Sequence, residues 1–233
     1  MTTHVILMGP QGSGKGTQAG RLGPRLGLLP VATGDLFRAA IKARTPLGVK
    51  VKDILDSGRL VSDDVTVALV EERLDEIAQR QALGEAANGA LYDGFPRTLG
   101  QAEALDAALA RRGEAVSAVI LLDVPRERLV RRLAGRRVCA SCGRVYNVES
   151  NPPRHAGVCD VCGGELRQRD DDTEDAVRRR LDLYFGETAP LTDYYRARGL
   201  LRTVDGDRGI DEVTEDLVSL VTQAGSPATK TTA

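Results

Sequence analysis

The stretch His4-Val-Ile-Leu-Met-Gly-Pro-Gln-Gly-Ser-Gly-Lys-Gly-Thr17 decides the fold, because an apolar run passes directly into a glycine-rich turn ending in Lys15. Glycines let the backbone curl until several N–H groups point inward, and a helix that begins near Lys15 adds the positive end of its dipole. The pattern G-x-x-x-x-G-K-[ST] is met at Gly9, Gly14 and Lys15, whereas Gly16 stands where serine or threonine is usual. A turn without a ligand is the alternative, but strand, glycines, lysine and helix stand in the order of a phosphate cradle. Because the hydroxyl after Lys15 is missing, we expect magnesium to be held there mainly by phosphates and waters.

The composition indicates a globular protein with one sizeable core and smaller attachments, since 42% of its 233 residues are hydrophobic. A net charge of −1 gives no overall attraction to nucleic acid or to an anionic membrane. No apolar run reaches the length needed to span a bilayer. The polar residues 1–4 leave no room for a signal peptide, so we expect a cytoplasmic protein.

Apolar segments alternate with segments of helical periodicity along most of the chain. The first strand, a helix that stops at Gly27 and a second strand form a β-α-β unit. Predicted strands cover residues 5–8, 28–32, 91–93, 116–124 and 200–204; predicted helices cover 15–26, 33–44, 46–58, 63–80, 99–111, 125–134, 210–224 and a segment that starts at 173 and is interrupted at Pro190. Strands joined by right-handed crossovers predict an α/β fold, a doubly wound five-stranded parallel sheet of the P-loop type. Its ligand site should lie beyond the carboxyl ends of the strands.

Two excursions interrupt this alternation and predict small inserted domains. The first consists of two short helices, and the second changes sharply in composition, with four cysteines, prolines, glycines and little aliphatic periodicity. The predicted division is a core of residues 1–31, 62–134 and 170–225, inserted domains at 32–61 and 135–169, and a disordered tail at 226–233.

Cys139-x-x-Cys142 and Cys159-x-x-Cys162 are separated by sixteen residues, a spacing typical of two zinc knuckles that present four thiolates tetrahedrally. A pair of disulfides is the competing interpretation, but cytoplasmic thiols stay reduced, and a segment so poor in aliphatic residues needs another source of stability. Four protein ligands leave no open coordination position, so we expect a structural zinc ion. His155, between the knuckles, is expected to be a solvated loop residue.

Four motifs in order resemble those of adenylate kinases, specifically the long bacterial form with a zinc-bearing lid. They are Gly9-Pro-Gln-Gly-Ser-Gly-Lys-Gly-Thr17, Ala32-Thr-Gly-Asp-Leu-Phe-Arg38, Asp93-Gly-Phe-Pro-Arg-Thr98 and Gly135-Arg-Arg-Val138. The Gly-Lys-Gly-Thr ending is itself typical of the family. The resemblance covers nearly the whole chain and implies the reaction Mg-ATP + AMP ⇌ 2 ADP. It also implies that residues 32–61 bind AMP and that residues 135–169 form a lid over ATP.

The resemblance implies roles for individual residues. Asp93 would hold a magnesium-bound water, and Arg208 would touch adenine through its backbone. The implied ATP-binding residues are Gly12, Ser13, Gly14, Lys15, Gly16, Thr17, Arg132, Arg136, Val145, Tyr146 and Arg208. The implied AMP-binding residues are Thr33, Arg38, Arg59, Leu60, Val61, Gly94, Phe95, Pro96, Arg97, Gln101, Arg169 and Arg180. Those implied to act in catalysis are Lys15, Arg97, Arg136, Arg169 and Arg180, whereas Arg178 and Arg179 are expected on a solvated helix face.

This set of residues suits phosphoryl transfer without a general base. The phosphate of AMP, with a second pKa of about 6, is mostly dianionic near neutral pH and needs no group to remove a proton. Cations around the transferred group offset the repulsion between two anionic substrates. Because water is a competing acceptor, we expect both inserted domains to close before the reaction.

Two other functions stay open on the sequence. One is a nucleoside monophosphate kinase that accepts UMP, CMP or GMP. The other is a zinc-ribbon nucleic-acid-binding P-loop protein, which the net charge and the lone aromatic residue of the knuckle region, Tyr146, disfavour. We expect ATP, AMP and ADP as partners, no nucleic acid or membrane, magnesium with ATP and one zinc ion as cofactors, and a monomer.

Overall fold

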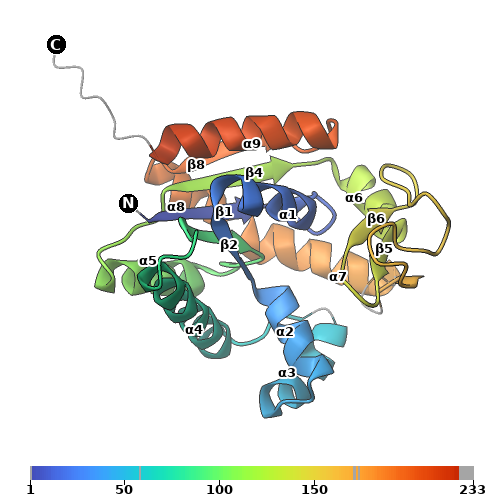
Figure 1. The fold of residues 1–233 in the computed structure, drawn as a ribbon, viewed down its shortest axis with the longest axis horizontal. Helices are drawn as coiled ribbons and strands as arrows, with labels where there is room; N and C mark the ends of the chain where they lie inside the picture. The colour runs from blue at the N-terminus through green and yellow to red at the C-terminus, as the bar shows by residue number, and fades with distance from the viewer. Residues whose placement is uncertain (1, 58, 170–171, 173, 226–233) are drawn as a thin grey trace.

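Strand β1 (Thr3–Met8) runs through the middle of a parallel sheet in the computed structural model, which describes residues 2–57, 59–169, 172 and 174–225 (Figure 1). Its residues from Val5 to Met8 are all buried. Val5 and Leu7 belong to one hydrophobic cluster, whereas Ile6 and Met8 belong to another. Because successive side chains of a strand point to opposite faces, β1 separates two layers of core.

The sheet has the strand order β2-β3-β1-β4-β8, and every pair is parallel. The other strands are β2 (Leu28–Ala32), β3 (Gly89–Asp93), β4 (Ala118–Asp123) and β8 (Leu201–Asp205). The prediction of a five-stranded parallel sheet is therefore confirmed. Strand β3 begins two residues earlier than expected, because Gly89 pairs with Thr3 on one side and with Leu28 on the other.

Helices cover both faces of the sheet, as a doubly wound fold requires. Helices α1 (Lys15–Leu26) and α9 (Ile210–Gly225) pack on the face of Val5 and Leu7. Helices α4 (Asp63–Ala82), α5 (Leu99–Arg111) and α8 (Leu191–Ala197) pack on the other face. No helix among the described residues has the length and apolar character to cross a membrane.

Helices α6 (Arg126–Ala134) and α7 (Glu174–Leu183) share a smaller cluster of their own, which includes Leu129 and Leu181. After α7 the chain forms a π-helical turn, η2 (Tyr184–Thr188), where the sequence predicted only an interruption at Pro190. The Ala189 N–H donates to the Tyr184 carbonyl at 2.7 Å. Such turns recur at functional sites, and this one reaches the cavity described below.

The two excursions predicted from the sequence fold around separate clusters. Helices α2 (Thr33–Lys42) and α3 (Pro46–Asp56) enclose Phe37, Val51 and Val61. Residues 136–167 form an antiparallel sheet of order β6-β5-β7, which the sequence did not predict. Its strands are β5 (Arg136–Cys139), β6 (Val145–Asn147) and β7 (Leu166–Arg167). Figure 1 shows both units projecting from the main sheet. The predicted tail, 226–233, and positions 58 and 173, predicted as helix ends, lie outside the described residues.

Candidate functional site

A cavity of about 840 Å³ opens at the carboxyl ends of β1, β3 and β8, where the fold predicts a ligand site. Most of the predicted site residues line it: Gly12, Ser13, Gly14, Lys15, Gly16, Thr17, Arg38, Leu60, Asp93, Gly94, Phe95, Pro96, Arg97, Arg132, Arg136, Val145, Tyr146, Arg169, Arg180 and Arg208. Among the described residues, four of those predicted to bind nucleotide lie outside this lining: Thr33, Arg59, Val61 and Gln101. Of the four predicted metal ligands, Cys142 lines the cavity and Cys139, Cys159 and Cys162 do not.

The glycine-rich turn after β1 forms one wall of the cavity. Gly12 and Gly14 have φ values of +85° and +102°, a region that side chains other than glycine rarely adopt. The Lys15 ammonium folds back over the turn and donates to the carbonyls of Gly9 at 2.7 Å and Pro10 at 2.9 Å. The buried Ser13 hydroxyl has no hydrogen-bond partner among the described residues. A ligand with acceptor oxygens would satisfy it, because an unpaired buried polar group is costly.

The charge of Lys15 is held in a strongly positive environment. Burial is the largest cause that lowers the pKa of its ammonium to about 8; Asp93 opposes this shift, while Arg97, Arg180 and Arg136 contribute to it. Bound phosphates would reverse this shift, because negative charge favours the protonated lysine. The cavity is therefore poised to receive anions.

Asp93 is the last residue of β3, and its carboxylate lies beside Gly16 of the glycine-rich turn. Burial raises the pKa of its carboxyl group, an effect that Lys15 counteracts. A side chain at position 16 would place its Cβ 3.4 Å from the Asp93 Oδ2 atom. The carboxylate thus lies beside the place of the missing serine or threonine hydroxyl. An oxygen ligand there suits a hydrated magnesium ion.

Asp172 brings two of the predicted catalytic arginines together. Its carboxylate, which has no exposed surface, accepts the Arg136 Nε–H at 2.8 Å and also contacts a terminal nitrogen of Arg136. The Arg180 guanidinium lies 3.9 Å from the same carboxylate. Sequence reasoning missed Asp172; the one available signal was the run of three aspartates that follows Arg169.

Arg97 is fixed by the loop that follows β3. Its Nε–H donates to the Gly94 carbonyl at 2.7 Å, and its backbone N–H donates to the Gln101 side chain at 2.8 Å. The Thr188 hydroxyl of the π-helical turn donates to the Arg97 carbonyl at 3.0 Å. Backbone and side chain of Arg97 are therefore both held by hydrogen bonds within the protein.

The four predicted nucleotide-binding residues outside the lining are held by contacts within the protein. Gln101 is buried and donates to Asp63 at 2.7 Å. Thr33 is buried and donates to the Gly94 carbonyl at 3.0 Å. Val61 packs into the cluster of α2 and α3, and the Arg59 Nε–H donates to the Ser57 hydroxyl at 2.9 Å. In this structure Gln101 and Thr33 support the loop that carries Arg97.

Asp207, after β8, is a second carboxylate that sequence reasoning missed. It accepts from Arg132 at 3.0 Å and from Arg128 at 3.1 Å, so it holds two arginines of α6 at the cavity wall. No sequence motif marked it. The Arg208 guanidinium pairs with Asp216 of α9.

The four cysteine sulfurs lie within 4.8 Å of one another. Cys139 and Cys162 are separated by 3.4 Å, and Cys142 and Cys159 by 3.6 Å, between sulfur atoms. A tetrahedral zinc ion with bonds of about 2.3 Å to sulfur would place its ligands about 3.8 Å apart. The geometry and the chemistry of the donor set both fit a zinc ion.

The two knuckles have the same backbone geometry. In the first, the Cys139 carbonyl accepts from the Gly143 N–H at 3.0 Å; in the second, the Cys159 carbonyl accepts from the Gly163 N–H at 2.9 Å. A hydrogen bond from Tyr146 is the largest of several that lower the pKa of the Cys159 thiol, to about 6. The thiolate form, which binds metal, is thereby favoured.

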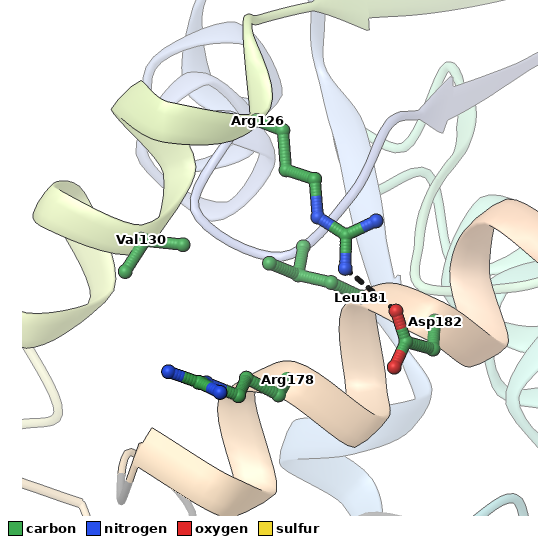
Figure 2. Close-up of a pocket in the computed structure, with 5 residues that line it drawn as sticks. All are labelled: Arg126, Val130, Arg178, Leu181 and Asp182. Atoms are coloured by element: carbon green, nitrogen blue, oxygen red, sulfur yellow. Dashed lines mark hydrogen bonds and ion pairs between the residues drawn. The ribbon is translucent and has the colours of Figure 1, made fainter.

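A smaller groove of about 400 Å³ lies between α6 and α7 and contains none of the predicted site residues. Figure 2 shows Arg126 of α6 and Asp182 of α7 pointing toward one another, and their charged groups are 2.6 Å apart. Arg178 is exposed beside them, as expected for a solvated helix face. The ion pair between Arg126 and Asp182 thus connects α6, which precedes the small sheet in the chain, with α7, which follows it.

Comparisons with known proteins agree with these features. A family model described as adenylate kinase matches residues 7–200. The adenylate kinase of Carboxydothermus hydrogenoformans is 51% identical over 209 residues, which cover 90% of this chain and 94% of the relative. That of Symbiobacterium thermophilum is 52% identical over 218 residues, covering 94% of this chain and 98% of the relative. That of Moorella thermoacetica is 52% identical over 210 residues, covering 90% and 94%.

Proposed function

The chain belongs to the adenylate kinase family, and from this premise we propose that it transfers the terminal phosphoryl group of Mg-ATP reversibly to AMP, giving two ADP. It is an enzyme, a phosphotransferase. The observation that carries the assignment is the convergence of Lys15, Arg97, Arg136, Arg169 and Arg180 on one cavity. The family does not favour UMP, CMP or GMP as the acceptor. It does not favour a nucleic-acid-binding role either.

The chain's own groups account for the chemistry. The dianionic phosphate of AMP is already a nucleophile, so the protein has to position two anions and stabilise the charge that develops between them. The proposed cations Lys15, Arg97 and Arg136 supply that stabilisation in a partly enclosed site, where charge interactions are stronger than in water. Magnesium bound with ATP supplies further positive charge along the phosphates. Asp93 would hold a water of that ion.

Substrate binding is divided between the two projecting units in our proposal. Residues 32–61 would cover AMP and residues 135–169 would cover ATP, with residues 1–31, 62–134 and 170–225 as the core. The separate hydrophobic clusters of the two units support this division. Closure of both units would exclude water, which is the competing acceptor.

The remaining assignments are also proposals. One structural zinc ion would be held by Cys139, Cys142, Cys159 and Cys162, supported by the proximity of their sulfurs. A cytoplasmic location is also proposed. We further propose that the enzyme is a monomer that binds no nucleic acid, which its net charge of −1 supports.

A screen of acceptors tests the function. With Mg-ATP as donor, kcat/KM for AMP should exceed the values for UMP, CMP and GMP by about two orders of magnitude or more, because a site built to hydrogen-bond one base leaves groups unpaired with another. Lys15→Ala should lose most of the turnover and keep the thermal unfolding temperature of the parent. Lys50→Ala, on the exposed side of α3, is the matched control and should keep full activity. Preference for another monophosphate would refute the acceptor, and a fully active Lys15→Ala enzyme would refute the site.

A further inference from the structure

Tyr146 has a role in the structure that differs from a simple contact with ATP. Its side chain lies in the middle of β6 and is only 3% exposed. It packs in a cluster with Cys139, Cys159 and Leu166, although part of the residue also lines the large cavity. The phenol oxygen lies 3.5 Å from the Cys159 sulfur. The hydroxyl is therefore directed at a proposed metal ligand.

The direction of this hydrogen bond follows from the second partner of the hydroxyl. The Asp160 N–H donates to the Tyr146 oxygen at 2.9 Å, so the hydroxyl proton is left for the sulfur. A metal-bound thiolate has no proton to give. In the metal-loaded lid the bond therefore runs from Tyr146 to Cys159.

We propose that Tyr146 is a positioning residue of the metal centre, whose hydroxyl donates to the Cys159 thiolate and fixes that ligand. The neighbouring residue ties the same strand to the nucleotide cavity, because the Asn147 amide donates to the Arg132 carbonyl of α6 at 2.9 Å. Successive residues of a strand point to opposite sides. Strand β6 is thus held by the sulfur cluster on one side and by α6 on the other.

This inference rests on the proposed zinc site and is tested on the whole protein by cobalt(II) substitution. Tyr146→Phe removes only the hydroxyl. Loss of such a partner typically costs 10–100-fold in metal affinity, so we expect cobalt(II) affinity, measured by competition with a chromophoric chelator, to fall about tenfold or more. The sulfur-to-cobalt charge-transfer band should move to longer wavelength, because the thiolate electrons are no longer stabilised by the hydrogen bond.

Tyr195→Phe is the matched control, because the Tyr195 hydroxyl is buried and has no hydrogen-bond partner among the described residues. It should change neither the affinity nor the band. If Tyr146→Phe keeps both the wild-type affinity and the wild-type band, the inference is overturned and the zinc site stands. If the wild-type protein gives no four-thiolate cobalt spectrum, the zinc site and the inference fail together.

A second pair of variants decides the matter if Tyr146→Phe does not fold. 4-Aminophenylalanine at position 146 retains a donor, whereas O-methyltyrosine retains the oxygen without a proton. A wild-type band with the amino side chain alone supports the inference. The same band with both side chains overturns it.

Discussion

Replacing Asp172 by asparagine should destabilise the nucleotide-free protein by about 3 kcal/mol, because it removes a buried negative charge that Arg136 and Arg180 share. The side chains involved are nearly inaccessible: Asp172 is 0% exposed, Arg136 15% and Arg180 13%. Breaking a buried ion pair by removing one partner costs about 3–5 kcal/mol. We use the lower end of this energy range, since the amide oxygen of asparagine can still accept one hydrogen bond.

For a protein of this size, 1 kcal/mol changes the unfolding temperature by about 2–4 °C, so the expected decrease is about 6–12 °C. Calorimetry without nucleotide measures it. The matched control is Asp193→Asn, which breaks a pair with Arg196 whose side chains are 79% and 62% exposed. Exposed pairs of this kind contribute about 0.5 kcal/mol or less.

A bisubstrate ligand, two adenosines joined by a chain of phosphates, distinguishes the electrostatic explanation from loss of packing. Its phosphates bring negative charge to the Arg136 and Arg180 guanidinium groups, so the difference between Asp172→Asn and the parent should shrink when the ligand is bound. An Asp172→Asn protein that unfolds within about 2 °C of Asp193→Asn without ligand would show that this pair is not a buried counter-charge.

Two further predictions concern protons and metal. Because the pKa of Lys15 is lowered to about 8 and bound phosphate raises it, a non-hydrolysable ATP analogue should take up a proton on binding near pH 8.5, and its affinity should weaken as pH rises through 8. Titration calorimetry in buffers of different ionisation enthalpy measures this uptake, which Lys15→Arg should abolish; unchanged uptake in that variant would contradict the reasoning. Elemental analysis should find one zinc per chain, and chelation should lower the unfolding temperature while turnover persists at temperatures where the lid stays ordered. Absence of metal in protein purified under reducing conditions would refute the zinc site.

Local patterns predicted the main sheet and its glycine-rich turn well. The apolar residues of β1 are followed directly by the glycine-rich turn, so the two were recognised together as one motif. The bounds of β2, α1 and α5 are those predicted. Boundaries shifted where pairing with distant strands decides them, as at Gly89. The small sheet was missed because its strands are only two to four residues long and its core consists partly of cysteines.

The carboxylates that hold the arginines could not be predicted from local sequence. Asp172 and Arg136 are 36 residues apart, and Asp207 and Arg132 are 75 apart. With 28% of all residues charged, many pairings of opposite sign are equally compatible with the sequence. Only the fold selects among them. The resemblance to a family implied which arginines matter and was silent on what holds them.

The internal partners divide the site's cations into two kinds. Lys15 and Arg97 donate to neutral backbone carbonyls, whereas Arg136 pairs with the charged carboxylate of Asp172. A phosphate oxygen competes readily with a carbonyl, because charge-assisted hydrogen bonds are about twice as strong as neutral ones. It competes poorly with a buried carboxylate. Lys15 can therefore exchange its carbonyl partners for substrate phosphate, while Arg136 keeps its carboxylate and stays in place as the phosphates arrive.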